Sequence, residues 1–370
     1  MKTLLKLSVA VLLINISCQP AEEQKSLSSK LDSLYALHPD FSGVVLVADK
    51  GKPVYHKAFG YKNFETKVLL DTATIFEVAS VSKQFTAMLI MMLKEEGKLD
   101  YDDLLEKYVQ GLPYPGITIR HLLHHTSGLP DYFVLMNEHW DKTKVAGNED
   151  VIDYLKQYHP ERLFAPNEKY NYSNTGYIML GSVVEKVSGK KFIQFAHERI
   201  FDPLKMNTTD IRSAEVKSSL PNFALGHMYV PEKSRYIRAD SFPESNYTIW
   251  VGGRKGPGRI SSTTFDLLKW DRALYTEDLV KRETLEQGFL PATLKNDSIS
   301  NYGFGWELRK HPTLGKVVWH GGDNPGYKAA IVRYIDADKT VIMLHNNVKG
   351  DFYDILGGID EIIGEGKGQR

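Results

Sequence analysis

The chain has a single cysteine, no long apolar run after its N-terminus, and no excess of charge of either sign. Cys18 is the only cysteine among the 370 residues, so an intrachain disulfide is excluded and the fold must rely on a buried core. The 46 Lys and Arg residues balance the 46 Asp and Glu residues, which gives no indication of nucleic-acid binding. The longest later apolar run, residues 88–93, is too short for a transmembrane helix.

The N-terminus has the pattern of an export signal. Lys2 and Lys6 precede a mostly apolar run over residues 7–14, which is typical of a signal peptide. Cys18 follows in Asn15-Ile16-Ser17-Cys18, a stretch that resembles a bacterial lipoprotein processing site with a lipidated cysteine. We therefore expect residues 1–18 to be a signal peptide, residues 19–25 to be a polar tether, and the protein to be lipid-anchored in the bacterial cell envelope. A plain signal peptide in which Cys18 has no role is the alternative.

Periodicity and turn residues predict an α/β (α+β) fold. Strands gather at the two ends of the chain and helices in the middle, so the simplest arrangement is an antiparallel sheet built from both termini with flanking helices, plus an inserted, mostly helical lobe. The α/β lobe is expected over residues 26–79 and 295–366, and the helical lobe over residues 80–294. Strands are expected at 41–47, 54–61, 302–308, 316–319, 329–334 and 340–344, and helices at 26–37, 80–96, 102–108, 117–125, 149–158, 174–187, 192–200, 261–274 and 352–363.

Residues 220–258 are rich in Pro, Gly and aromatic residues and show no clear period. Such a composition is typical of a long loop region, and long loops in compact domains often cover functional sites.

Ser80 and Lys83 form a Ser-x-x-Lys pair at the start of a predicted helix. A serine hydroxyl needs help to lose its proton, and a lysine at i+3 lies on the same helix face. The unpaired N–H groups of a helix N-terminus also favour developing negative charge. This arrangement is typical of a serine acyl-transfer enzyme. The alternative is that Ser80 caps the helix and Lys83 lies on a solvated face.

A second tripeptide, Tyr172-Ser173-Asn174, precedes another predicted helix. A phenol has a pKa of ~10 in water, and a Lys83 ammonium nearby would favour the phenolate, making Tyr172 a workable general base. Asn174 offers a donor and an acceptor for an amide carbonyl and a lysine. The alternative is a turn in which Asn174 caps the helix and Tyr172 packs in the core.

A third stretch, His320-Gly321-Gly322, lies at the end of a predicted strand. Glycines there allow close approach of a ligand backbone and can present a backbone N–H to an oxyanion. The alternative is a glycine bulge at the strand end.

Taken together and in this order, the three stretches resemble the serine β-lactamase and penicillin-binding protein superfamily, in its class C-like branch. That branch includes D-Ala-D-Ala carboxypeptidases, D-aminopeptidases and esterases. The resemblance covers roughly residues 26–366 and implies a β-lactamase/transpeptidase-like fold over that range. Shorter matches add to it: His125-Thr126-Ser127-Gly128-Leu129 and Tyr302-Gly303-Phe304-Gly305-Trp306.

The resemblance implies a serine hydrolase that works through an acyl-enzyme. Ser80 would be the nucleophile, and Lys83 and Tyr172 would share the proton transfers. Asn174 would hold the substrate amide, His320 and Gly322 would line the substrate site, and the N–H groups of Ser80 and Asp323 would form the oxyanion hole. No metal or organic cofactor is implied. The expected partner is a small-molecule or peptide substrate, peptidoglycan-derived compounds included.

One departure from the family pattern concerns the third motif, which reads His320-Gly321-Gly322 where relatives have Lys-Thr-Gly. Gly321 offers no hydroxyl, and a histidine of ordinary pKa is mostly neutral near pH 7. Recognition of a β-lactam or D-Ala carboxylate at this motif is therefore expected to be weak, with weak β-lactam turnover at best.

Two other readings compete with the hydrolase. The first is a lipoprotein of the same fold that binds peptidoglycan or a partner without catalysis. The second is a metal site at His121, His124 and His125, since i+3 and i+4 spacings suit metal ligands. We favour a capped helix end with partly buried histidines, because the stretch holds no carboxylate and adjacent side chains diverge on a helix.

Overall fold

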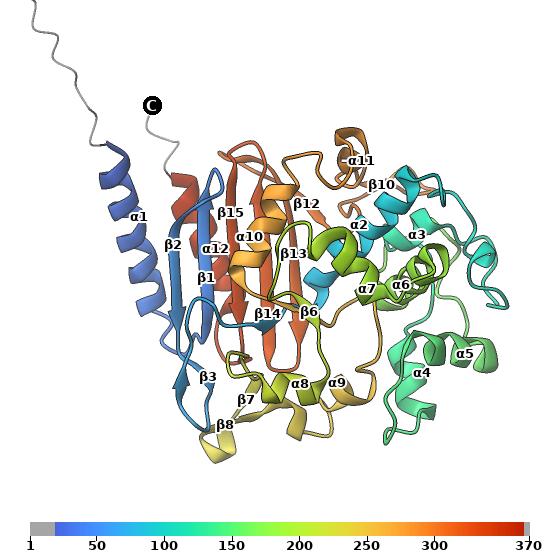
Figure 1. Cartoon of the computed structure of the whole chain (residues 1–370), viewed down its shortest axis with the longest axis horizontal. Helices are drawn as coiled ribbons and strands as arrows, with labels where there is room; N and C mark the ends of the chain where they lie inside the picture. Colours follow the sequence, from blue (N-terminus) through green and yellow to red (C-terminus); the bar gives the residue numbers. More distant parts are fainter. Residues whose placement is uncertain (1–18, 366–370) are drawn as a thin grey trace, which may run out of the picture.

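A six-stranded antiparallel sheet joins the two ends of the chain (Figure 1). The computed structural model describes residues 19–365, and their side chains from Gln24 onward. The strand order is β12-β13-β14-β15-β1-β2, and β1 pairs with β15 so that Val45 lies opposite Met343. The sheet predicted from both termini is thus confirmed. Its strands are β1 (Gly43–Asp49), β2 (Lys52–Phe59), β12 (Glu307–His311), β13 (Gly315–Asn324), β14 (Tyr327–Tyr334) and β15 (Lys339–His345).

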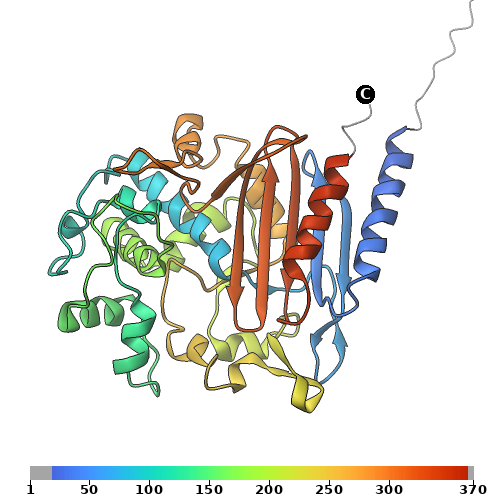
Figure 2. The same ribbon diagram turned by 180° about the vertical axis from the view of Figure 1, so that it is seen from behind.

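Both faces of this sheet are covered, which explains the continuous apolar run in β1. Val45 and Val47 pack in a core that includes α1 (Gln19–Ala36) and α12 (Phe352–Glu365), while Val44 and Leu46 pack in the core of the other face. Figure 2 shows α1 and α12 side by side on one face. On the opposite face lies α10 (Thr264–Ala273), where Asp271 pairs with the buried Arg333 of β14 at 2.6 Å.

The helical lobe is organised around α2 (Ser82–Glu95), whose residues 82–93 are all buried. Because this helix is surrounded by neighbours, its middle, residues 87–93, is apolar on every side, and its buried polar side chains lie near the N-terminus. It packs against α6 (Asn174–Ser188), and its core is continuous with one face of the sheet. The remaining helices are α3 (Ile119–Leu123), α4 (Tyr132–His139), α5 (Asn148–Tyr158), α7 (Phe192–Ala196), α8 (Ala214–Ser219), α9 (Tyr247–Trp250) and α11 (Arg282–Gln287).

Short strands complete the fold between these helices. A three-stranded sheet has the order β5-β9-β6, and three two-stranded ribbons pair β3 with β4, β7 with β8, and β10 with β11. Their bounds are β3 (Tyr61–Asn63), β4 (Val68–Leu69), β5 (Phe76–Glu77), β6 (Asp210–Ile211), β7 (His227–Val230), β8 (Arg235–Arg238), β9 (Ile260–Ser262), β10 (Ala292–Thr293) and β11 (Ile299–Ser300).

Several predicted elements differ from the structure. Residues 19–25, expected as a tether, belong to α1, because the helix begins at Gln19. Residues 102–108 hold only a short 3₁₀ turn at Leu105–Lys107, and residues 302–308 contribute a single bridge before β12 begins. The predicted loop over 220–258 contains the β7–β8 ribbon and the short helix α9. Cys18 and the predicted signal peptide lie outside the described residues.

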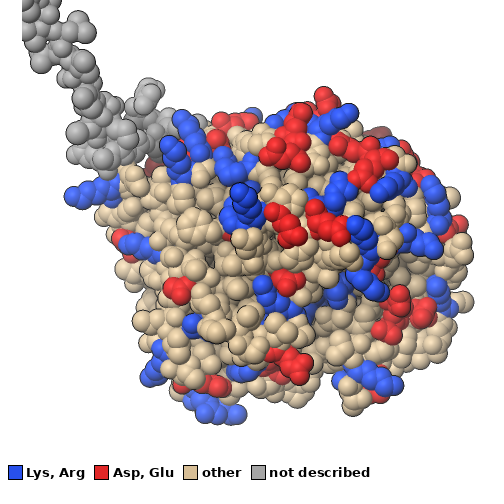
Figure 3. Space-filling view, in the orientation of Figure 1, with Lys and Arg blue, Asp and Glu red and all other residues tan. Residues whose placement is uncertain are grey.

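Charged side chains of both signs are interspersed over the face drawn in Figure 3, in keeping with the zero net charge. Within residues 19–365, no helix is both long enough and apolar enough to cross a membrane.

Candidate active site

Ser80 lies in a 3₁₀ turn, Ala79–Val81, directly before α2. The turn is reached from β5, which pairs with β9, and the N–H of Val78 donates to the carbonyl of Ile260 at 2.9 Å. The N-cap position of α2 is Val81, and no side chain caps the helix. The alternative in which Ser80 serves as a helix cap is therefore wrong, and its hydroxyl is free for another partner.

That partner is Lys83, one of the most deeply buried side chains of the protein. Its Nζ lies 3.0 Å from Ser80 Oγ, 2.8 Å from Asn174 Oδ1 and 2.8 Å from the carbonyl oxygen of Pro257. The structure therefore brings Ser80, Lys83 and Asn174 together as predicted. It also adds Pro257, which sequence reasoning did not single out.

The surroundings of Lys83 favour a neutral amine. Burial, assisted by the charge of Arg254, lowers the pKa of Lys83 well below its ordinary value. A neutral amine has two N–H donors and one lone pair, and the carbonyl of Pro257 and the amide oxygen of Asn174 can only accept. The lone pair is then left for Ser80, the one neighbour with a proton to give. This arrangement can withdraw a proton from the Ser80 hydroxyl.

Tyr172 lies at the same site, just before α6, with its ring 4.7 Å from Lys83 Nζ. Although 37% of the residue is exposed, desolvation raises the pKa of Tyr172, against a smaller lowering by the Ser80 hydroxyl. Desolvation thus favours the neutral forms of both groups in the free enzyme, rather than the expected phenolate beside a Lys83 ammonium. A neutral phenol is a proton donor.

His125 holds the segment that carries Tyr172. Its carbonyl accepts from the N–H of Asn171 at 2.9 Å, and its Nδ1 accepts from the N–H of Ser173 at 3.0 Å. Its ring packs 4.3 Å from the ring of Tyr172. Burial lowers the pKa of His125 well below its ordinary value, which keeps Nδ1 available as an acceptor.

The three histidines predicted at this helix end each use a ring nitrogen on the backbone. Nδ1 of His121 accepts from the N–H of Thr118 at 3.1 Å, and Nδ1 of His124 donates to the carbonyl of Tyr302 at 2.8 Å. No group of three potential metal ligands converges within the part of the chain that the structure describes. The side-chain cap of α3 lies at its N-terminus, where Thr118 and His121 form a capping box, rather than at the C-terminal end where the sequence predicted it.

Gly322 of β13 packs directly on the turn that carries Ser80. A Cβ at this position would lie 2.3 Å from the carbonyl oxygen of Val78 and 3.2 Å from the N–H nitrogen of Ser80. The ladder between β12 and β13 ends at the pair Glu307–Trp319, so residues 320–324 extend past β12 toward the site. Only glycine permits this close approach of the strand to the nucleophile.

His320 departs from the predicted substrate-binding role, because its side chain is buried. Nδ1 donates to the carbonyl of Gly321, so Nε2 must accept from the hydroxyl of Tyr302 at 2.8 Å. Burial lowers the pKa of His320 to about 3. The imidazole is therefore neutral at physiological pH and supplies no positive charge to a substrate.

A cavity of about 230 Å³ opens beside Ser80. Its lining includes Asn174 and Asp323, as predicted, and also Tyr132, Tyr247 and Arg254. The last two belong to residues 220–258, where sequence reasoning expected a segment over the site but had no periodicity with which to select individual side chains.

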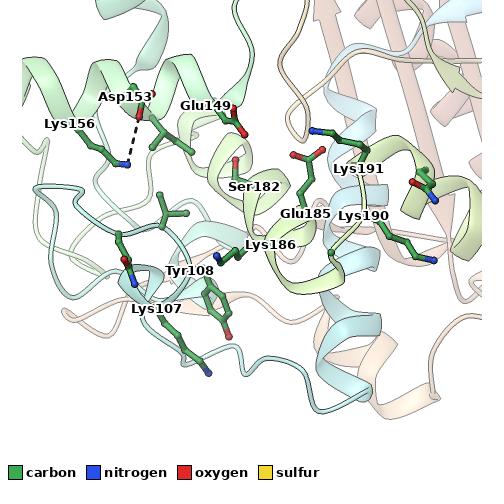
Figure 4. A pocket seen from close by; sticks show the side chains of 15 residues that line it. Lys107, Tyr108, Glu149, Asp153, Lys156, Ser182, Glu185, Lys186, Lys190 and Lys191 are labelled. Atoms are coloured by element: carbon green, nitrogen blue, oxygen red, sulfur yellow. Dashed lines mark ion pairs between the residues drawn. The ribbon is translucent and has the colours of Figure 1, made fainter.

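A second cavity, of about 810 Å³, lies on the helical lobe away from Ser80 (Figure 4). Its lining is a mixture of lysines and acids, such as Lys156 and Asp153, which lie 3.8 Å apart. The one serine of its lining, Ser182, donates its hydroxyl to the carbonyl of Ile178 at 3.2 Å.

Comparisons with known proteins identify the family of the chain. The family described as Beta-lactamase matches residues 31–359. Penicillin-binding protein 4* of Bacillus subtilis (strain 168) is 39% identical over 344 residues, which cover 92% of this chain and 76% of that protein. The D-aminopeptidase of Gluconobacter oxydans (strain 621H) is 25% identical over 87% of this chain, which spans only 59% of that relative.

Solved structures share the fold. A penicillin-binding protein from Bacillus halodurans superposes with a TM-score of 0.76 at 25% identity, covering 90% of this chain and 98% of that one. The D-amino acid amidase from Ochrobactrum anthropi SV3 superposes with a TM-score of 0.74 at 22% identity, covering 92% and 97% respectively. The predicted β-lactamase/transpeptidase-like fold is thereby confirmed, and the chain belongs to the Beta-lactamase family of serine hydrolases.

Proposed function

We propose that the protein hydrolyses an amide, peptide or ester bond through an acyl-enzyme on Ser80. The observation that carries this proposal is the 3.0 Å contact between Ser80 Oγ and a fully buried Lys83 Nζ. Burial of a lysine disfavours its charged form and costs free energy. A lysine buried in this way beside a nucleophile is typical of a functional site, where the neutral amine acts as a base. This also argues against the alternative of a binding protein without catalysis.

In the proposed acylation, Ser80 Oγ attacks the substrate carbonyl carbon while its proton passes to Lys83 Nζ. The oxyanion is bound by the backbone N–H groups of Ser80 and Asp323, and Asn174 holds the substrate amide. Tyr172 gives its proton to the departing amine or alcohol and is reprotonated from Lys83. The carbonyl carbon is then esterified to Ser80, and the leaving group departs neutral.

In deacylation, a water molecule attacks the Ser80 ester and gives up one proton to the base formed by Lys83 and Tyr172. The Ser80–carbonyl bond breaks, the acid product leaves, and Ser80 recovers its proton. Both steps use the same groups in opposite directions, as reversibility requires.

For the substrate, we propose a peptide or amide of a D-amino acid, or an ester, with weak β-lactam turnover at best. The similarity to a D-aminopeptidase and a penicillin-binding protein supports the first class. The buried, neutral His320 and the absence of a hydroxyl at Gly321 argue against strong binding of a β-lactam carboxylate at this motif. Efficient hydrolysis of a cephalosporin by the purified protein would overturn this substrate assignment.

Intact mass after incubation with a fluorophosphonate probe, and separately with a penicillin, tests the nucleophile. Ser82 offers a matched control, because it is a serine only two residues away, at the start of α2, and its Oγ accepts from the N–H of Ile260 at 3.2 Å. We expect one probe per chain in the wild type and in Ser82→Ala, and none in Ser80→Ala. Labelling that persists in Ser80→Ala, or no adduct with either probe, would refute the acyl-enzyme.

We further propose that the protein is exported and lipid-anchored at Cys18 in the bacterial cell envelope. The charged and apolar pattern of residues 1–18 supports this. The N-terminal peptide of membrane-purified protein should begin at a lipid-modified Cys18, and Cys18→Ala should leave the membrane fraction. An unmodified Cys18 in the membrane-purified protein would contradict the anchor.

A further inference from the structure

Arg254 is a buried guanidinium at the active-site cavity without an acidic partner. It is 7% exposed and lines the cavity beside Ser80. Its one side-chain hydrogen bond among the described residues runs from Nη1 to the carbonyl of Val251 at 3.1 Å, and no carboxylate of residues 24–365 forms an ion pair with it. Buried charges in proteins are normally paired, so an unpaired one needs an explanation.

Glu77, a buried acid whose pKa the charge of Arg254 helps to lower, is already bonded to other groups. Glu77 pairs with Lys217 and, at 3.4 Å, with Arg259, and it accepts a hydrogen bond from Asn324. Burial raises the pKa of Glu77, but the charges of Arg259 and Lys217 outweigh it and lower the value to about 2. Glu77, Lys217 and Arg259 line a separate cavity, and only Arg254 of the three buried cations lines the cavity beside Ser80. Because Glu77 is shared between Lys217 and Arg259, the charge of Arg254 is left as an excess positive charge at the wall of the Ser80 cavity.

The acids at the cavity rim do not remove this excess. Asp323 is exposed and pairs with Lys328 at 2.6 Å. Asp131 is also exposed, and it accepts from the N–H of Phe133 at the start of α4. Neither forms an ion pair with the guanidinium, so the charge of Arg254 remains unpaired at the cavity wall.

The position of the cavity indicates which part of the substrate would contact Arg254. Its lining includes Asn174 and Arg254 but neither Tyr172 nor His320, so it extends from Ser80 away from Tyr172. In the proposed reaction the leaving group must lie near Tyr172, from which it takes a proton. The acyl part of the substrate is then the part that enters the cavity, and a volume of about 230 Å³ admits a small acyl group.

We propose that Arg254 binds a carboxylate carried by the acyl part of the substrate, so that the preferred acyl group ends in an acid. The proposal rests on the acyl-enzyme function proposed above and names its substrate class. A guanidinium matches a carboxylate through two parallel N–H donors, and such pairs are strong where water is excluded. The tyrosines of the wall, one of them with its ring 5.9 Å from the guanidinium carbon, would shield the pair from solvent.

The test compares two anilides that differ only in the end of the acyl chain. Release of 4-nitroaniline is measured from glutaryl 4-nitroanilide, whose chain ends in a carboxylate, and from pentanoyl 4-nitroanilide, which is neutral and of equal length. We expect the wild type to prefer the glutaryl compound in kcat/KM by roughly 10- to 100-fold, as for a hydrogen-bonded charge pair. Arg254→Met should abolish this preference, and Arg254→Lys should keep part of it.

Two controls make the assignment specific. Lys142→Met removes an exposed lysine that lies over Trp250, 5.4 Å from the ring centre, without lining the cavity, and should keep the full preference. Pentanoyl 3-carboxy-4-nitroanilide places the carboxylate on the leaving group instead. Its rate relative to the plain pentanoyl compound should be the same in the wild type and in Arg254→Met.

Three results with an enzyme that hydrolyses the anilides would overturn the proposal. These are equal rates for the two acyl chains in the wild type, a preference that persists in Arg254→Met, and an effect of Arg254→Met on the leaving-group carboxylate alone. The wild-type comparison stands even if Arg254→Met does not fold. If the protein labels at Ser80 but hydrolyses neither anilide, the proposal also fails while the nucleophile stands. Absence of any label at Ser80 would instead refute the proposed function.

Discussion

The burial of the Lys83 side chain costs free energy, because a lysine amine is normally charged and hydrated. The side chain is fully buried, and burial lowers its pKa well below the ordinary 10.5. In the unfolded chain the same amine is protonated at neutral pH, so folding releases a proton. Stability then rises with pH up to the unfolded-state pKa, because the unfolded chain binds more protons over this range.

This linkage predicts a pH-dependent effect of Lys83→Met on the free energy of unfolding. As pH rises from about 7 to about 10, the wild type should gain stability relative to the variant by up to about 1.4 kcal/mol per pH unit. Urea unfolding at several pH values measures the difference. Lys94→Met is the control, because Lys94 lies on the same helix but is 36% exposed. A difference that does not change with pH would show that Lys83 is charged in the folded protein.

Substitution of Gly322 tests the contact between β13 and the turn that carries Ser80. In Gly322→Ala the new Cβ would meet the carbonyl of Val78 at 2.3 Å, so the strand must move away from Ser80. We expect kcat to fall by roughly 100- to 1000-fold, as when an oxyanion donor is lost. In Gly321→Ala the nearest atom would be the Tyr353 hydroxyl oxygen at 3.2 Å, which can shift. Equal activities of the two variants would contradict the role of Gly322.

Among single residues, the sequence predicted those site residues that belong to motifs with a characteristic spacing. Ser80 and Lys83 are three residues apart on one helix, and Asn174 follows in a short motif, so order and spacing sufficed. Arg254 and Pro257 have no such signature. Their roles depend on the position of a segment of irregular structure, which the sequence does not determine by any pattern. The burial that favours a neutral Tyr172 phenol comes from residues that are distant in the chain.

At the scale of elements, His125 joins the end of α3 to the start of α6. It bonds the backbone of Asn171 and Ser173 on either side of Tyr172. Two hydrogen bonds in this region therefore depend on His125, one on its neutral imidazole and one on its backbone carbonyl. A misplacement of a reacting group by about 1 Å can lower the rate by about 100-fold.

His125→Ala should therefore reduce kcat by roughly 10- to 100-fold through misplacement of Tyr172. His125→Asn should recover part of the loss, because its Oδ1 can accept from the N–H of Ser173. The corresponding control is His121→Ala, which removes the same kind of bond to the N–H of Thr118. Equal losses in the alanine and asparagine variants would mean that His125 acts only through packing.

Elements with a strong period were predicted within a few residues, such as the strands β14 and β15 and the helix α6. The misassigned elements had weak or misleading local signals. The polar residues 19–25 looked like a tether, yet they continue α1, whose apolar positions pack against the sheet and α12. The β7–β8 ribbon was missed because its four-residue strands alternate only once or twice.

At the scale of the whole molecule, one carboxylate links segments that are far apart in the chain. Glu77 of β5 contacts Lys217 of α8, Arg259 before β9 and Asn324 of β13. These partners lie on three segments that are far apart in the chain. No sequence pattern predicts such a network, because none of its members are neighbours in the chain.

Glu77→Gln leaves two buried cations without a counter-charge and should destabilise the protein by about 3–5 kcal/mol near neutral pH. The carboxyl has a lowered pKa of about 2 against an ordinary 4.5. Its contribution is therefore complete above pH 4.5 and is lost as pH falls toward 2. Urea unfolding at falling pH should show the two proteins converging, whereas Glu138→Gln, at an exposed site, should match the wild type throughout. A constant gap down to low pH would contradict the ion network.

The pH dependence of Ser80 acylation tests the central claim most directly. The rate of labelling by the fluorophosphonate probe would be followed from about pH 5 to about pH 10 in the wild type and in Tyr172→Phe. If neutral Lys83 is the base, the rate rises with pH through one ionisation below the ordinary lysine value, and this rise persists in Tyr172→Phe. A flat profile, or a rise that disappears in Tyr172→Phe, would contradict Lys83 as the group that activates Ser80.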